Sequence, residues 1–258
     1  SGEDPNKRVR NINFNNSVLI LHTHKDYMPD VPDKAKNFCN SNGIRNIFHI
    51  DCAYLEESEG FSTDPPDKLN FSEIYGGFNH HPINYCYHAG VFPPIVSCEK
   101  KYDIGFSGIS KTTHRGTLDT RSELIKKVRK LCKKNKLSSN FMENRNYDTL
   151  EEYQDSMMKT RIWIDTITMG GHISARLWEI PPHNAAILTV EDEKYEGILK
   201  DGQNAIIIKK DFSDLEEKIL FYLKNPKELY NIVQSAKEDI RNRHTTYSRL
   251  QEMLKLAT

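Results

Sequence analysis

Short apolar runs alternate with stretches of helical periodicity along the chain. The first run, residues 18–21, is typical of a strand buried on both faces of a parallel sheet. Residues 33–42 predict a short helix ended by Gly43, and a second strand follows at 46–51. These segments make one strand–helix–strand unit. Residues 56–94 are rich in glycine, proline, asparagine and aromatic residues, which indicates long connecting loops.

The alternation is more regular from residue 102 onward. Strands are predicted at 102–108, 137–142, 161–165, 185–190 and 205–208. One helix is predicted from Asp119 or Thr120, and a second after an N-cap at Asp148. A third is predicted from Gly170-Gly171 through 176–179. The end of the chain, 214–256, is predicted to be helical with a break at Asn225-Pro226. Strands and helices alternating at this spacing predict a parallel sheet with helices on both faces.

Length and composition limit the possible architectures and partners. A chain of 258 residues can bury a sizeable core. We expect a flexible tail at 1–10, then domains at 11–96 and 97–258. Basic and acidic residues are equal at 36 each, which favours a small molecule or neutral polymer over nucleic acid as the partner.

The remaining composition suggests where the protein works. No apolar run approaches the ~20 residues of a membrane span, so a soluble protein is expected. The chain begins Ser1-Gly2 rather than with methionine, which indicates either a cleaved tag or an excised piece. Five scattered cysteines, an odd number, predict free thiols and a cytoplasmic location. The histidines lack partners at metal-ligand spacing, so we expect neither a metal nor a cofactor.

The segment from Gly170 to Glu179 is the most specific candidate for ligand binding. Paired glycines, Gly170-Gly171, allow a backbone to approach a phosphate closely, and the following helix start offers free N–H groups. The acceptor-only carboxylate of Glu179 suits the two hydroxyls of a ribose. The alternative is a plain turn followed by a solvated glutamate.

A set of short motifs extends this evidence over residues 85–254. The motifs are Tyr102–Gly108, Arg121, Ser174-Ala175-Arg176-Leu177-Trp178-Glu179, His244-Thr245-Thr246 and Arg249. In this order they resemble the C-terminal half of the spore-protein-type, group 1-like glycosyltransferases of the GT-B group, with a weaker likeness to exostosin-type transferases. The resemblance implies an α/β, GT-B-like fold with two Rossmann-type domains, the N-terminal one short. It also implies sugar transfer from a nucleotide-diphosphate sugar, and a UDP-linked donor is expected.

The resemblance assigns roles within the donor site. In such enzymes the second carboxylate of a Glu-x7-Glu motif binds the nucleotide ribose, and Glu179 matches it. The first carboxylate falls at Gly171 here, with His172 or Glu191 as alternatives for binding sugar hydroxyls. The glycine that usually follows falls at Asn184.

Basic residues after the strand at 102–108 suit a diphosphate. Lys111, His114 and Arg121 could neutralise it together, with Arg121 as the first choice; an exposed arginine at a helix start is the alternative. The segment 141–144, ending in Asn144, corresponds to the place where related enzymes hold the base. The sequence contains no Asp-x-Asp for a bridging metal, so transfer without a metal is expected.

The catalytic base should come from the first domain, on the acceptor side. Polar residues follow its first strand directly, where open sheets bind ligands. Asp26 is the preferred base and His24 the reserve, with His22, His80 and His81 as further candidates.

Two other functions compete with sugar transfer to a glycan or other hydroxyl acceptor. The first is a non-catalytic nucleotide- or carbohydrate-binding protein on a degenerate GT-B fold, which the missing first glutamate favours. The second is an NAD-dependent oxidoreductase, which is weakened because no Gly-x-Gly-x-x-Gly follows the first strand.

Overall fold

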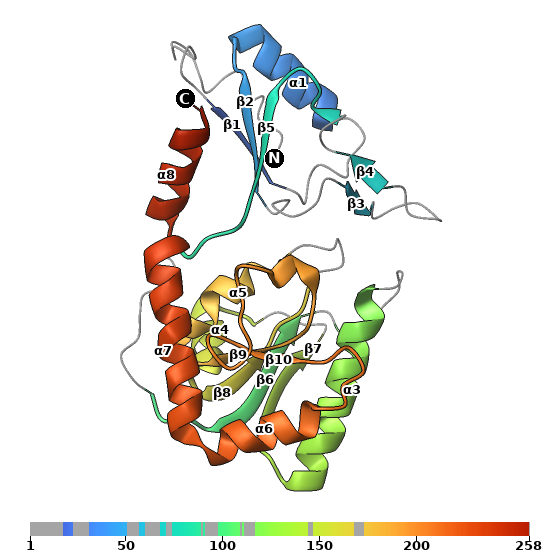
Figure 1. Cartoon of the computed structure of the whole chain (residues 1–258), viewed down its shortest axis with the longest axis vertical. Helices are drawn as coiled ribbons and strands as arrows, with labels where there is room; N and C mark the ends of the chain where they lie inside the picture. Colours follow the sequence, from blue (N-terminus) through green and yellow to red (C-terminus); the bar gives the residue numbers. More distant parts are fainter. Residues whose placement is uncertain are drawn as a thin grey trace. The chain divides into compact units, whose positions relative to one another are not determined.

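The computed structural model places the chain in two compact units (Figure 1). The structure describes residues 18–22, 31–50, 57–59, 68–70, 74–88, 90, 98–108, 110, 117–143, 147–167 and 173–257. Unit 1 comprises residues 1–84 and 253–258, and unit 2 comprises residues 85–252. The expected tail, 1–10, lies outside the described residues. None of the helices in the described ranges combines the length and apolarity that a bilayer crossing requires.

Unit 1 is built on a three-stranded parallel sheet in the order β1-β2-β5. Its elements are β1 (Val18–His22), α1 (Val31–Asn42), β2 (Asn46–Ile50), the antiparallel pair β3 (Glu57–Glu59) and β4 (Lys68–Asn70), and β5 (Asn79–Ile83). Successive side chains of a strand point to opposite faces. Accordingly, Ile47 packs with residues of α1, whereas Phe48 packs with Met253 near the end of the last helix. Both faces of the sheet are therefore covered.

The region 56–94, expected to consist of loops, contains the third strand of this sheet. β5 pairs in parallel with β2 along its whole length. That expectation was wrong because the segment Asn79-His80-His81-Pro82-Ile83 has no apolar alternation. β5 lies at the edge of the three-stranded sheet, where a proline such as Pro82 is tolerated.

Unit 2 contains a five-stranded, all-parallel sheet in the order β10-β9-β8-β6-β7. Its strands are β6 (Tyr102–Gly108), β7 (Ser139–Glu143), β8 (Thr160–Ile164), β9 (Ala186–Val190) and β10 (Ile206–Ile208). Its helices are α3 (Thr117–Asn135), α4 (Leu150–Met158), α5 (Arg176–Glu179), η3 (Pro181–His183), η4 (Glu193–Tyr195), α6 (Leu215–Lys224), α7 (Pro226–Arg243) and α8 (Thr246–Ala257), whose last residues belong to unit 1. Each strand predicted from an apolar run in this half is present, and the predicted break at Asn225-Pro226 separates α6 from α7.

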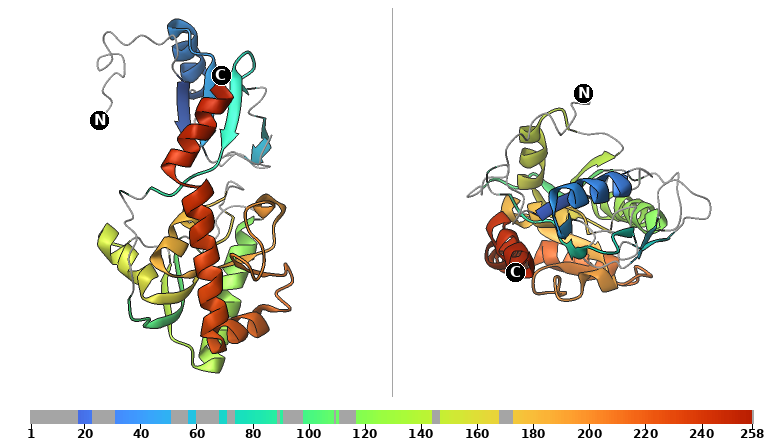
Figure 2. Two further views of the ribbon diagram at one scale, coloured as in Figure 1. Left: turned by 60° about the vertical axis from the view of Figure 1, so that its left-hand side comes forward. Right: turned by 90° about the horizontal axis from the view of Figure 1, so that it is seen from above.

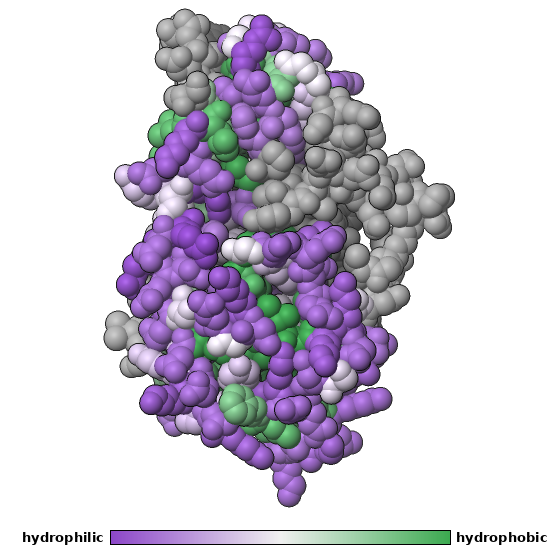
Figure 3. Space-filling model, viewed as in Figure 1, coloured by the Kyte–Doolittle hydropathy of each residue, from purple (hydrophilic) through white to green (hydrophobic). Residues whose placement is uncertain are grey.

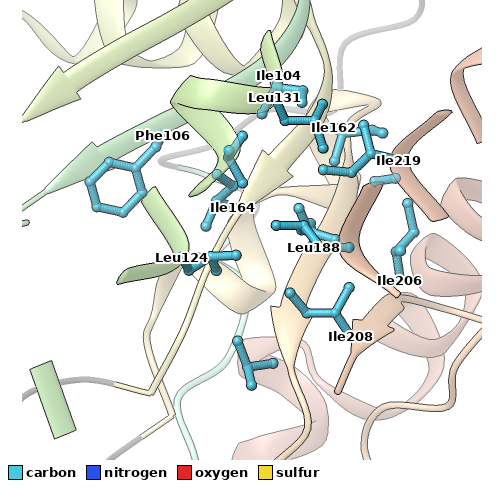
Figure 4. Packing of buried hydrophobic residues seen from close by; sticks show 14 of the residues in the cluster. Ile104, Phe106, Leu124, Leu131, Ile162, Ile164, Leu188, Ile206, Ile208 and Ile219 are labelled. Carbon is cyan, nitrogen blue, oxygen red and sulfur yellow. The ribbon is translucent and has the colours of Figure 1, made fainter. Parts of the chain in front are cut away.

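Two apolar layers sandwich the unit 2 sheet. Ile162 and Ile164 of β8 join the layer under α3 and α6, which Figure 4 shows from close by. Trp163, between them, joins the layer with α4 and α5. Helix α7, which runs along unit 2 in Figure 2, contributes residues to both layers. Gly105 makes room for Trp163, because a Cβ there would lie 2.6 Å from the indole ring.

Local capping corrects one predicted helix start. Thr149, rather than Asp148, caps α4: its hydroxyl accepts a hydrogen bond from the Glu152 amide at 3.1 Å. The Glu152 carboxylate in turn accepts from the Asp148 amide at 3.1 Å. The pair resembles a capping box, except that Glu152 accepts from the residue before the N-cap, and the two bonds together satisfy two amides where a single aspartate cap would satisfy one.

Candidate functional site

The strand order of unit 2 reverses between β6 and β8. The chain passes from β6 through α3 to β7 on one side, whereas β8 is followed by β9 on the other side. In open parallel sheets, ligands bind in the crevice outside the carboxyl ends of the strands at such a reversal. Because β6 ends at Gly108 and β8 at Ile164, the residues that follow them mark the expected site.

Asp165, the residue that follows β8, is a buried carboxylate at this reversal. Its side chain is 1% exposed, and its Oδ1 lies 3.6 Å from Nε of Arg176. Burial raises the pKa of Asp165 above its ordinary value, and the charges of Arg176 and Arg121 oppose that rise. The carboxylate is therefore stabilised by the two arginines, and it helps to fix where Arg176 lies.

Arg176, the first residue of α5, is held by neighbours on both sides. Its Nη1 donates to the carbonyl of Ser107, and its Nε donates to Oγ of Ser174 at 3.4 Å. Gly108 has a φ of +129°, and a Cβ there would lie 2.6 Å from Nη1, so the strand can end this way only with glycine. One fifth of the Arg176 side chain is exposed, so its guanidinium can contact an anionic ligand.

Arg121, near the start of α3, is buried against the loop that follows β8. Its Nε donates to Oγ1 of Thr166 at 2.6 Å, and its Nη2 donates to the carbonyls of Thr166 at 3.2 Å and Ile167 at 2.9 Å. Only 4% of the residue is exposed. Burial, together with the charge of Arg176, lowers its pKa to about 10. Arg121 therefore supports the loop at 165–167, and a direct contact with a diphosphate stays a prediction.

Glu179 ends α5, one turn after Arg176, and is partly buried. The hydroxyl of Tyr153 in α4 donates to its Oε2 at 2.7 Å. Burial raises the pKa of Glu179, while this hydrogen bond and the charge of Arg176 lower it. Within the described residues, Oε1 accepts no hydrogen bond. One carboxylate oxygen is therefore held in place and the other is left for a ligand hydroxyl.

The far side of α5 packs against the junction of α7 and α8. The ring of Trp178 stacks on His244, with the ring centroids 4.3 Å apart. Arg249 in turn donates from Nη2 to the carbonyl of Tyr85 at 3.1 Å. His244 and Arg249, which belong to the motif set found in the sequence, thus support the short helix that carries Glu179.

Acidification should loosen this packing. Burial, together with the charges of Arg249 and Arg243, lowers the pKa of His244 to about 4. An unfolded histidine titrates near pH ~6.5, so the unfolded chain takes up the proton first. The contribution of His244 to stability is complete above that pH and falls progressively toward pH 4.

Thermal unfolding of a His244→Phe variant measures this effect, because phenylalanine keeps the ring but cannot be protonated. Between pH 7 and pH 5, the Tm of the wild-type protein should fall further than that of the variant, by several degrees. Equal losses in the two proteins would contradict the assignment of the proton to His244.

A polar cavity of about 150 Å³ lies at the carboxyl ends of β8 and β9. Its polar lining residues are Thr120, Thr166, Thr189, Glu191, Asp192 and Lys210. Oε1 of Glu191 accepts from the Lys210 amide at 3.0 Å, which fixes the carboxylate at the cavity wall. The cavity thus combines hydroxyls, carboxylates and one amine, a set of groups that can bind a hydroxyl-rich ligand.

The structure describes four of the donor-site residues predicted from sequence. They are Arg121, Ser174, Arg176 and Glu179, and they lie in one cluster, since Arg176 bonds to Ser174 and affects the pKa values of Arg121 and Glu179. The other predicted donor residues lie outside the described ranges: Lys111, His114, Asn144, Gly170, Gly171 and His172. The same holds for the predicted catalytic pair, Asp26 and His24.

Sequence reasoning missed two members of the cluster, Asp165 and Tyr153. Asp165 is a polar residue directly after a buried strand, and this signal was applied to the first domain but not here. Tyr153 lies in a helix that the sequence predicts, but no motif marks it as a site residue, whereas its hydroxyl reaches Glu179. Only the fold brings Tyr153 to a residue 26 positions away.

The further candidates for the base, His80 and His81, lie in β5 and are engaged there. Nε2 of His80 lies 3.3 Å from Nδ1 of the buried His49, and its ring stacks on Tyr75 with centroids 5.3 Å apart. The ring of His81 stacks on Phe48 at 4.8 Å. In the described part of the chain, no group of three or more His, Cys, Asp or Glu side chains could hold a metal ion.

Comparisons with known proteins identify a family and a fold. The model of the glycosyl transferase-like family matches residues 121–255. Among solved structures, TarM has a TM-score of 0.59 and 12% identity over 93% of this chain. Anabaena Alr3699/HepE in complex with UDP-glucose has a TM-score of 0.52 and 11% identity over 92%. A glycosyltransferase from Rickettsia africae has a TM-score of 0.50 and 12% identity over 92%.

These similarities differ in how much of each protein they cover. The match spans 54% of TarM, 71% of the Anabaena protein and 69% of the Rickettsia protein. No curated protein matches the chain in sequence. At identities of 11–12%, such likenesses establish a shared fold, which is that of GT-B glycosyltransferases.

Proposed function

Because the chain belongs to the glycosyl transferase-like family, we propose that it moves a hexose or pentose from a nucleotide-diphosphate sugar to a hydroxyl acceptor without a metal. The donor is UDP-linked and the acceptor is a glycan or another hydroxyl compound. One observation carries the proposal: the cluster of Asp165, Arg176 and Glu179 lies at the reversal of strand order in unit 2.

Arg176 and Glu179 bind different parts of the donor. The guanidinium of Arg176, partly exposed and fixed by Ser107, Ser174 and Asp165, offsets charge on the diphosphate. Lys111 and His114 add positive charge from the loop after β6. Oε1 of Glu179, one turn along α5, accepts from a ribose hydroxyl. The absence of Asp-x-Asp from the sequence agrees with neutralisation by basic side chains.

The transferred sugar occupies the polar cavity beside this cluster. Glu191 lines that cavity and takes the role of the missing first carboxylate, with His172 as the alternative. Asp192, on the same wall, accepts a second sugar hydroxyl. The nucleobase of the donor is held by backbone groups near Asn144.

Unit 1 supplies the catalytic base. Asp26, or His24 in its place, takes the proton of the acceptor hydroxyl. The acceptor oxygen then bonds to the anomeric carbon while the bond from that carbon to the diphosphate oxygen breaks. The nucleotide diphosphate leaves with the electron pair. The negative charge that develops on it is stabilised by the guanidinium of Arg176.

Product analysis tests this function. The protein is incubated with UDP-sugars and hydroxyl acceptors in EDTA, and release of UDP with transfer or hydrolysis of the sugar is expected. Activity that disappears in EDTA and returns with manganese would contradict transfer without a metal. Nucleotide binding without any turnover would instead establish the non-catalytic alternative, which Gly171 at the position of the first carboxylate favours.

Glu179→Ala should weaken UDP binding by about 1–3 kcal/mol, the range for loss of a hydrogen bond to a charged group. Tyr153→Phe should cause a smaller loss, because it frees Glu179 without removing the carboxylate. Glu217→Ala, at an exposed position of α6, is the matched control and should leave binding unchanged. Calorimetric titration with UDP measures all three, and unchanged affinity in a folded Glu179→Ala protein would exclude Glu179 from the site.

A further inference from the structure

A second, larger cavity lies at the amino edge of the unit 2 sheet. Its volume is about 370 Å³, within the ~300–1,000 Å³ typical of small-molecule sites. Lys100, just before β6, and Arg161, the second residue of β8, line one end. β6 and β8 lead from this cavity to the cluster at Ser107 and Asp165. The cavity and the candidate donor site therefore lie at opposite ends of the same two strands.

The walls of this cavity are apolar and come from the α6–α7 junction, which Figure 1 shows at the foot of unit 2. The apolar lining residues are Leu223, Pro226, Leu229, Tyr230 and Val233. Tyr230 is 62% exposed, and Figure 3 shows apolar side chains at the surface over α6. Such a lining favours a ligand with an apolar body.

The polar end of the cavity is positively charged. Lys100 and Arg161 are its charged lining residues, and among the residues that the structure describes no aspartate or glutamate lines it. Nζ of Lys100 donates to the carbonyls of Met158 at 2.7 Å, Thr160 at 2.8 Å and Asn184 at 2.6 Å. These bonds use its three protons, so Lys100 supplies charge to the cavity but no free donor.

Arg161 can supply the donors that Lys100 lacks. Its side chain is 43% exposed, and its only ion pair in the described residues is a long one of 3.5 Å with Asp103. Lys237, bonded to the Asn184 side chain, adds a third cation nearby. Burial, together with the charges of Lys237 and Arg161, lowers the pKa of Lys100 to about 8. An anion bound here would offset this mutual repulsion.

We propose that this cavity binds a small amphiphile with one anionic head and an apolar tail, of the medium-chain carboxylate class. The carboxylate pairs with the guanidinium of Arg161 within the field of Lys100, and the tail packs against Leu229 and Val233. The two features that select this ligand are the apolar walls and the polar end, whose described charged side chains, Lys100 and Arg161, are both cations. The proposal is independent of sugar transfer, because none of these residues belongs to the donor site.

Calorimetric titration with octanoate, and with octan-1-ol as its uncharged analogue, tests the proposal. Octanoate should bind with a Kd below about 1 mM. Arg161→Gln should weaken octanoate at least about 10-fold, the effect of losing a charge-assisted hydrogen bond. The alcohol should bind the two proteins equally. Lys227→Gln, which removes a charge from α7 outside the cavity lining, should bind octanoate like the wild type.

A second variant adds charge instead of removing it. Gln234 lines the cavity, and Gln234→Glu places a carboxylate there with almost no change in shape. Octanoate affinity should fall at least about 10-fold, while the UDP affinity and the Tm stay unchanged. No octanoate binding by the wild type, unchanged binding by both Arg161→Gln and Gln234→Glu, or an equal loss in Lys227→Gln would each overturn the proposal.

Discussion

Replacing Arg176 with methionine should destabilise unit 2 by about 3–5 kcal/mol, the range for removing one partner of a buried ion pair. The reason is Asp165, whose carboxylate is 1% exposed and lies 3.6 Å from Nε of Arg176. Without the guanidinium, that carboxylate stays buried with less compensation, and the carbonyl of Ser107 loses a donor. Chemical denaturation followed by circular dichroism measures the loss.

Two further variants separate the contribution of the Asp165–Arg176 ion pair to stability from the general effect of replacing an arginine. Arg243→Met removes an arginine that is 51% exposed and paired with Asp239, so it should cost about 0–1 kcal/mol. Combining Arg176→Met with Asp165→Leu removes both members of the pair and should recover much of the lost stability. UDP affinity should stay weakened in the double variant, because the diphosphate contact is still missing. A loss below about 1 kcal/mol for Arg176→Met alone would contradict the role of the pair.

Asp26→Asn should lower turnover by about 100-fold or more while UDP affinity stays nearly constant. Asparagine is close to aspartate in shape but cannot take the proton of the acceptor hydroxyl. The base is expected in unit 1, whereas the donor groups Arg176 and Glu179 belong to unit 2. The two measurements should therefore separate, with kcat falling and the Kd for UDP unchanged.

His24→Ala is the companion variant, since His24 is the reserve for the same role. If both variants keep normal turnover, the base lies elsewhere, and the histidines of β5 become the next candidates. If both lose UDP binding together with turnover, unit 1 contributes to donor binding and the division of labour proposed here is wrong.

The sequence predicted the sheet of unit 2 better than that of unit 1, for a physical reason. Strands buried on both faces have continuous apolar sequences, and β9 and β10 are examples. β5 carries asparagine, two histidines and a proline, and it is held by backbone pairing with β2 and by ring stacking. Those interactions leave no apolar period, so the strand could be recognised only in three dimensions.

The residues of the candidate site likewise divide into those that the sequence predicts and those that only the structure reveals. Arg176 and Glu179 could be predicted because they lie in one short motif whose family resemblance carries a role. Asp165 could not, because its significance comes from burial beside arginines that are distant in sequence. Asn184 shows how a departure from the family pattern can be harmless. It stands where a glycine is usual and adopts a φ of 61°, a left-handed conformation that asparagine tolerates better than most residues.

Hydrogen–deuterium exchange with saturating UDP tests most directly whether the nucleotide binds at the carboxyl edge of the unit 2 sheet. Amides at 165–167 and 173–179 should exchange more slowly with UDP than without it, and the effect should weaken in Glu179→Ala. Amides at the amino edge, around 98–101, should be unaffected. Protection confined to unit 1 or to that amino edge, with no change at 165–179, would contradict the assignment of the donor site.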